Sequence, residues 1–85
     1  MIDAAEVMDR LAETNYVTRT RWYPFDHRGT FEMVDGHEYT LSTDEYGIYL
    51  EDDVSASWFA DIESLLQWTR GYNKAYRNAL RKEGK

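Results

Sequence analysis

The sequence predicts an α+β fold: an N-terminal helix, an antiparallel meander of three to four strands and a long C-terminal helix, in the order α-β-β-β-β-α. Apolar residues at helical spacing occupy both ends of the chain. Between them, short β-branched and aromatic runs alternate with turn residues. The 85 residues leave room for one core, so we expect a single small domain over residues 1–85. Placing both helices on one face of the sheet is the simplest way to bury their apolar stripes.

The first helix is predicted over residues 3–14. Asp3 can cap it by accepting hydrogen bonds from first-turn amides, and Glu6 lies near the positive end of the helix dipole. Asn15 is expected to end the helix in the left-handed conformation. One helical face is apolar and carries Ala4, Met8, Leu11 and Ala12.

A strand is predicted over residues 16–23, because nearly all of them are β-branched or aromatic. Alternation puts Arg19 and Arg21 on a side that faces solvent. The residues after this strand, 24–29, form a loop by their turn composition. The other side of the strand carries Thr18, Thr20 and Trp22.

The register of the next hairpin can be argued from its apolar residues. A two-residue turn would place Phe31 and Tyr39 on opposite faces of the sheet. A three-residue turn over 34–36, with its glycine left-handed, pairs Met33 with His37 instead. We predict this turn because it brings four apolar residues to the core: Phe31, Met33, Tyr39 and Leu41.

A turn over residues 43–47 is predicted to lead into a fourth strand. Ser55 or Ser57 would then cap the last helix. The strand is expected to point Ile48 and Leu50 inward and Tyr49 outward.

The last helix is predicted over roughly residues 58–82, with a break at Gly71 as the alternative. Glycine at that position costs about 1 kcal/mol relative to alanine. Residues 81–85 are expected to form a basic tail that can fray. The 3.6-residue period is kept by Ile62, Leu65, Leu66, Thr69, Tyr72, Tyr76, Ala79 and Leu80.

Charge is strongly segregated along the chain. Between Gly29 and Thr69 there is no lysine or arginine, but there are ten carboxylates. Residues 1–69 hold four basic and fifteen acidic side chains, and residues 70–85 hold six basic and one acidic, for a net charge of −6. This distribution sets a field over the surface that bears on which partners the protein attracts.

The acidic stretch is the leading candidate for a partner-binding surface. Carboxylates at alternate strand positions would repeat about every 6.6–6.8 Å, which is similar to the spacing along one strand of nucleic acid. Exposed tyrosine and tryptophan would serve as anchors, because interface hot spots favour them. The alternative is that the carboxylates only keep a small, aromatic-rich protein soluble. The predicted partner-binding residues are Glu32, Glu38, Asp44, Glu45, Tyr46, Tyr49, Glu51, Asp52, Asp53 and Trp58.

The C-terminal stretch offers an alternative basic face for nucleic acid. Its cations can equally complement the helix dipole or pair with the acidic sheet. The net charge of −6 opposes stable phosphate contact, so we do not expect nucleic acid as a direct ligand. The residues of this face are Arg70, Lys74, Arg77 and Arg81.

No motif in the sequence indicates catalysis, a cofactor or a metal. It has no cysteine, no glycine-rich phosphate loop and no calcium-binding loop pattern. His27 and His37, with Asp26 and Glu38, could bind a metal only if their loops met. We therefore predict a protein that is not an enzyme and has no cofactor or metal. No secretory signal or membrane-spanning run is visible, so we expect a cytoplasmic protein without membrane contact.

In size, charge and aromatic content the chain is similar to the small acidic inhibitors of phages and mobile elements, including anti-CRISPR proteins and DNA mimics. The likeness involves no residue-level motif and assigns no sites. It implies a stoichiometric binder that blocks a basic, often nucleic-acid-handling protein. Three alternatives stay open: a self-associating structural or regulatory module in which basic tail meets acidic sheet, an immunity or antitoxin type of inhibitor, and a nucleic-acid binder.

Overall fold

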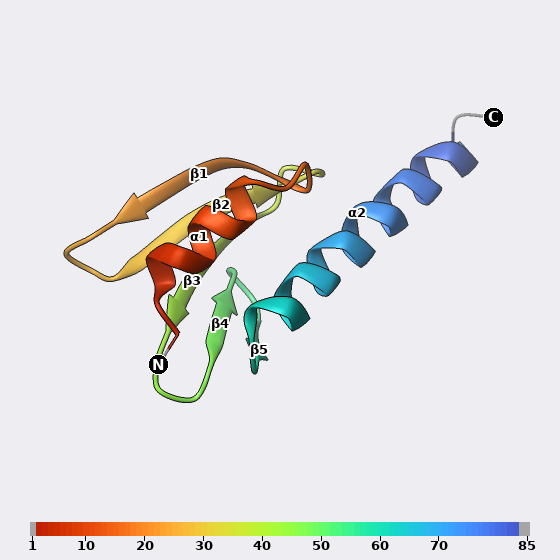
Figure 1. The fold of residues 1–85 in the computed structure, drawn as a ribbon. Coiled ribbons are helices and arrows are strands. Elements are labelled where there is room, and N and C mark those ends of the chain that lie inside the picture. Colours follow the sequence, from red (N-terminus) through yellow and green to blue (C-terminus); the bar gives the residue numbers. More distant parts are fainter. Residues whose placement is uncertain (1, 84–85) are drawn as a thin grey trace.

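The computed structural model describes residues 2–83 and shows an α+β fold with a helix at each end of the chain (Figure 1). Five strands form one antiparallel sheet in the order β1-β2-β3-β4-β5. The predicted fold class is therefore confirmed, with one strand more than the three to four expected. The elements are α1 (Ala4–Ala12), β1 (Val17–Tyr23), β2 (Arg28–Met33), β3 (Glu38–Thr43), β4 (Ile48–Glu51), β5 (Ala56–Phe59) and α2 (Ile62–Glu83).

Helix α1 begins as predicted but ends differently. The Asp3 carboxylate accepts a hydrogen bond of 3.1 Å from the Ala5 amide, which confirms the cap. The prediction of a left-handed Asn15 is wrong, because the helix ends at Glu13 with a right-handed φ of −72°. The Thr14 hydroxyl donates to the Leu11 carbonyl at 2.7 Å, so a local side chain satisfies the helix end without a left-handed residue.

A bulge in β1 changes part of the predicted sidedness, because Arg21 and Trp22 lie on their predicted faces but Thr18 does not. The register against β2 shifts between Thr18 and Arg21, and Arg19 has a φ of 50°. Val17 is buried in the core, and Thr18 lies on the opposite face of the sheet. The extra residue restores the alternation, so that Trp22 faces the core as expected.

The β2–β3 hairpin has the predicted register. The Met33 amide donates to the His37 carbonyl at 2.9 Å across a three-residue turn. Gly36 in that turn has a φ of 86°, a conformation that glycine adopts without steric cost. Phe31 pairs with Tyr39, and the apolar side chains of both strands face the core.

The fifth strand is the element that the sequence prediction missed. Residues 56–59 pair with β4 and do not begin the last helix, so neither Ser55 nor Ser57 caps it. The Asp52 carboxylate accepts hydrogen bonds from the amides of the next turn, which reverses the chain onto β4. Asp61 precedes α2, and its carboxylate accepts a hydrogen bond from the Ser64 amide at 2.8 Å. The helix then continues through Gly71 without a break, as predicted.

Both helices pack on one face of the sheet, which we call the inner face. The Arg10 guanidinium of α1 pairs with the Glu63 carboxylate of α2 at 3.4 Å. The Trp68 ring of α2 lies 5.4 Å from the Tyr39 ring and 5.7 Å from the Phe59 ring, measured between centroids. The buried core contains Ala4, Val7, Met8, Leu11, Val17, Phe31, Met33, Leu41, Ile48, Leu50 and Leu65.

The second half of α2 leaves this core and projects beyond the sheet (Figure 1). From Lys74 to Lys82 every residue except Tyr76 is exposed. The radius of gyration is 13.2 Å, whereas a compact chain of this length would have about 12 Å. Residues 84–85 of the predicted tail lie outside the described residues. Within the described chain, neither helix combines the length and apolar character that a membrane crossing requires.

Candidate partner-binding surface

The sheet face opposite the two helices, which we call the outer face, is not covered by either helix of the described chain. The strand register aligns its side chains in rows that cross all five strands. Tyr49 and Trp58 stand directly opposite each other on β4 and β5, and Trp58 is 51% exposed. The first row contains Tyr23, Arg28, Ser42, Tyr49 and Trp58. The row next to it contains Arg21, Thr30, Thr40, Glu51 and Ala56.

The Trp58 indole is held over the chain at Gly47. A side chain at that glycine would place its Cβ atom 2.6 Å from the indole Nε1. Gly47 is buried beneath the indole, and the absence of a side chain there leaves room for the indole to lie against the backbone. The outer face thus presents an exposed Trp58 beside a half-buried Tyr49.

Carboxylates gather at one end of the sheet, because alternate turns of a meander lie at the same end. The β2–β3 turn and the β4–β5 turn meet there around a concave surface of about 370 Å³. Glu32 lies beside it, paired with Glu38 across the two strands. We call this surface the acidic hollow; it is lined by Gly36, His37, Glu38, Thr40, Glu51, Asp52 and Asp53.

Asp52 holds the shape of the hollow. Its carboxylate accepts hydrogen bonds from the amides of Val54 and Ser55, and from His37 Nε2 at 2.9 Å. These bonds, the two backbone ones first, lower the pKa of Asp52 to about 2. Its side chain is only 8% exposed, so little of this carboxylate remains for a partner.

Three other carboxylates of the hollow are free. Glu38, Glu51 and Asp53 are exposed, and none forms an ion pair with a lysine, arginine or histidine within residues 2–83. Glu32 is less available, because it pairs with Arg19 at 3.5 Å and its side chain is 21% exposed. The hollow therefore presents three uncompensated negative charges to solvent.

The remaining predicted residues lie at the opposite end of the sheet. Asp44, Glu45 and Tyr46 belong to the β3–β4 turn, where the Asp44 carboxylate accepts hydrogen bonds from the amides of Tyr46 and Gly47 at 2.7 and 3.0 Å. Tyr46 is 71% exposed. The acidic stretch of the sequence thus forms two separate surfaces, with the Tyr49 and Trp58 pair between them.

A contact that the sequence analysis did not single out fastens α2 to the acidic end. The Tyr72 hydroxyl donates to Asp35 Oδ2 at 2.6 Å. Partial burial acts to raise the pKa of Asp35, but hydrogen bonds from Tyr72 and from the His37 amide bring it below its ordinary value. Burial, together with the Asp35 carboxylate, raises the pKa of Tyr72. Both residue types are common on surfaces, so no sequence signal predicts that they meet.

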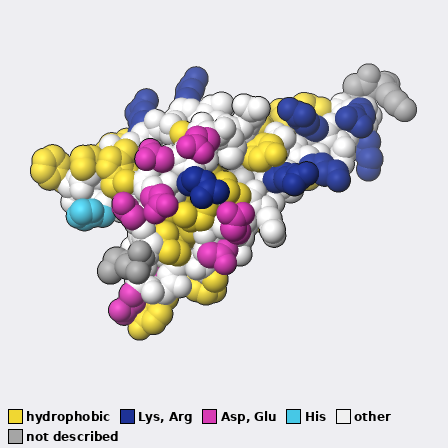
Figure 2. Space-filling view, viewed as in Figure 1, with side chains coloured by type: hydrophobic (Ala, Val, Ile, Leu, Met, Phe, Trp, Pro, Cys, Tyr) yellow, Lys and Arg dark blue, Asp and Glu magenta, His cyan; other side chains and the backbone are white. Residues whose placement is uncertain are grey.

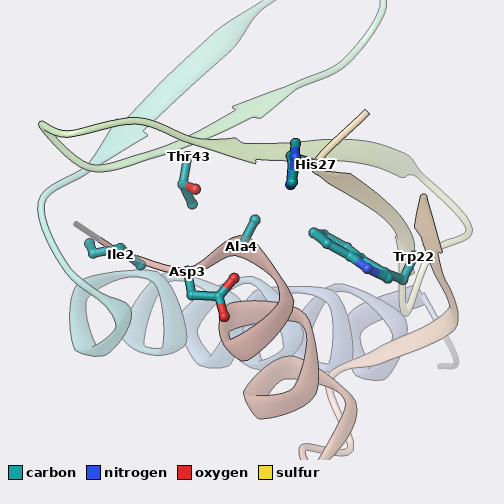
Figure 3. Close-up of a pocket in the computed structure, with 6 residues that line it drawn as sticks. All are labelled: Ile2, Asp3, Ala4, Trp22, His27 and Thr43. Atoms are coloured by element: carbon teal, nitrogen blue, oxygen red, sulfur yellow. The ribbon is translucent and has the colours of Figure 1, made fainter. Parts of the chain in front are cut away.

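A second hollow, of about 500 Å³, lies between the first turn of α1 and the sheet at the end away from the acidic hollow. In Figure 3, Ile2 and Trp22 stand at its two sides and His27 and Thr43 reach into it from the sheet. The Asp3 carboxylate accepts its hydrogen bond from the Ala5 amide of the same helix.

The two histidines lie in turns at opposite ends of β2, so the metal site considered from the sequence does not form. His27 precedes β2 and His37 follows it. Across residues 2–83 no group of three or more His, Asp or Glu side chains is arranged to hold a metal ion.

The predicted basic face lies on α2. Figure 2 shows Lys and Arg side chains along the projecting part of this helix, while the Asp and Glu side chains in this view gather over the rest of the molecule. All four predicted residues are exposed: Arg70, Lys74, Arg77 and Arg81.

A scan against protein-family models, a search of curated proteins and a search of solved structures each found no match for this chain.

Proposed function

We propose that this protein is a non-enzymatic binder that inhibits a basic, nucleic-acid-handling protein by occupying its basic surface. The observation that supports this proposal is the grouping of three free carboxylates, Glu38, Glu51 and Asp53, around one hollow. The cross-strand pair of Tyr49 and Trp58 lies on the adjoining outer face.

The two parts of this surface have different roles in the proposal. Exposed charges steer a basic partner and speed its association, but they add little affinity because solvent and salt screen them. Burial of the Tyr49 and Trp58 rings supplies most of the binding free energy, since aromatic anchors dominate interface energetics. Association should therefore be fast and salt-sensitive, and dissociation should depend on Trp58.

Charge reversal with a matched control tests the proposal. Glu51→Lys with Asp53→Lys reverses the hollow, and Asp44→Lys with Glu45→Lys makes the same change in net charge at the opposite end of the sheet. Each tagged variant is used to capture proteins from a nuclease-treated candidate host lysate, with washes at low and then high salt. A captured basic protein is then assayed for nucleic-acid binding with and without this chain.

The hollow variant is expected to lose capture and inhibition, because its two new lysines repel a basic partner, while the opposite-end variant keeps both. Trp58→Ala should weaken binding by about 2 kcal/mol or more, mainly through faster dissociation. Equal losses in the two reversed variants would show that only net charge matters. Undiminished capture by the hollow variant would contradict the proposal.

A further inference from the structure

The projecting part of α2 is a second surface feature, because its charged and apolar side chains face solvent. Up to Asn73, which is 7% exposed, the helix packs on the body of the protein. The bond between Tyr72 and Asp35 then marks where it passes the end of the sheet. Beyond that point lie residues 74–83, which we call the projecting segment.

The projecting segment is strongly basic. Lys74, Arg77 and Arg81, at spacings of three and four residues, form one cationic stripe. None of them forms an ion pair with a carboxylate of residues 2–82, the range whose side chains the structure describes. Leu80 continues the apolar stripe of the packed half but is 48% exposed. A helix without tertiary contacts depends on propensity alone, so a docked partner would stabilise it.

The same molecule carries a surface that complements this segment in charge, polarity and length. The acidic hollow offers free carboxylates, and the outer face offers the exposed Trp58. Ten helical residues extend about 15 Å. Tyr49 in β4 and Asp53 just after it are four residues apart, which spans at most about 13 Å of extended chain. A helix of this length can therefore contact both the carboxylates and the aromatic pair.

We infer that the projecting segment docks on the acidic hollow and outer face of a second copy of this chain. The segment and the hollow lie at the same end of the sheet, because Tyr72 is bonded to the turn that borders the hollow. In the dimer that we infer, a two-fold axis relates the copies and each lends its segment to the other. The dimer does not depend on the proposed function, and a basic partner would compete with it for the hollow.

Sedimentation velocity of the purified protein, over a range of concentrations at low and high salt, tests this dimer. The wild-type chain is expected to dimerise at low salt and to dissociate as salt screens the contacts. Two variants should each be monomeric: Arg77→Glu with Arg81→Glu, and Glu51→Lys with Asp53→Lys. Circular dichroism verifies that both remain folded. The control Asp44→Lys with Glu45→Lys should dimerise like the wild type.

Mixing the two variants is the decisive step. Each alone brings like charges together, whereas in a mixed dimer both contacts join opposite charges, so dimers should reappear on mixing. A single chain with all four substitutions should also dimerise. A mixture that stays monomeric, a wild type that is monomeric at low salt, or a two-substitution variant that still dimerises on its own would overturn the inference. So would a monomer whose segment binds a short oligonucleotide.

The two proposals fail separately. A monomer that still captures a basic protein through Glu51 and Asp53 would refute the dimer and leave the proposed function standing. A dimer that behaves as expected but captures no basic protein would refute the proposed function alone.

Discussion

The two halves of α2 have the same hydrophobic period and opposite surroundings. In the first half, Leu65 and Thr69 are fully buried, and Trp68 packs against rings from the sheet. In the second half, Leu80 occupies the same helical stripe and is 48% exposed. The helix is longer than the sheet beneath it. An amphipathic stripe therefore indicates which side of a helix can be buried, but not what buries it.

Truncating a leucine in each half tests this contrast with the largest expected effect. Leu65→Ala should lower the free energy of unfolding by about 2–5 kcal/mol, because it leaves a cavity in a packed core. Leu80→Ala should change it by no more than about 0.5 kcal/mol in the monomer. Urea unfolding at high salt and low protein concentration measures both. Similar losses at the two positions would contradict the contrast.

Gly71 lies near the junction of the two halves and allows a change in the stabilising direction. A Cβ atom added there would have no other atom within 4 Å. Gly71→Ala should therefore raise the free energy of unfolding by about 1 kcal/mol, through the lower helix propensity of glycine.

The same substitution at Gly29 is expected to have the opposite effect on stability. Its added Cβ would lie 2.6 Å from the Met8 Sδ of α1. Gly29→Ala should destabilise the protein by about 1–3 kcal/mol, because the packed core must move. Thermal unfolding of the two variants should shift the midpoint in opposite directions, and a shift in the same direction would contradict the geometry.

The side-chain hydrogen bond from Tyr72 to Asp35 ties α2 to the β2–β3 turn. Its removal is expected to change the free energy of unfolding the least of the substitutions within the packed part of the protein. Tyr72→Phe should cost about 0.5–1.5 kcal/mol at neutral pH. The pKa of Asp35 is lowered in the folded state, so its contribution is present above the ordinary value of 3.8 and is lost as pH falls below it. The free energy of unfolding of Tyr72→Phe should therefore fall less on acidification than that of the wild type.

Asp52 must be separated from this effect because it titrates in the same range. Its pKa of about 2 in the folded state gives it a contribution that disappears as pH falls from 3.8 toward 2. Asp52→Asn keeps a carbonyl oxygen for the turn amides but removes this titration. Urea unfolding over this range, with each variant alone and combined, should show two additive reductions in acid sensitivity. No reduction in Tyr72→Phe would contradict the assigned role of Asp35.

Local patterns predicted the elements whose determinants lie close together in the chain. The Asp3 cap, the inward Ile48 and Leu50, and the three-residue turn with left-handed Gly36 all depend on neighbouring residues or on one hairpin. The continuous helix across Gly71 also followed from its period alone. For the site, the sequence named the free carboxylates and the Tyr49 and Trp58 anchors as candidates.

Only the tertiary structure decided how these parts meet. Strand β5 needed the Asp52 turn and the open edge of β4, and the β1 bulge needed pairing with β2. Successive turns of the meander lie at alternate ends of the sheet, and this decides which carboxylates share a hollow. The exposure of Leu80 depends on where the sheet stops. Backbone conformation and periodicity are short-range properties that the sequence by itself determines, whereas burial and charge grouping depend on residues distant in the chain, so they are settled only by the packed fold.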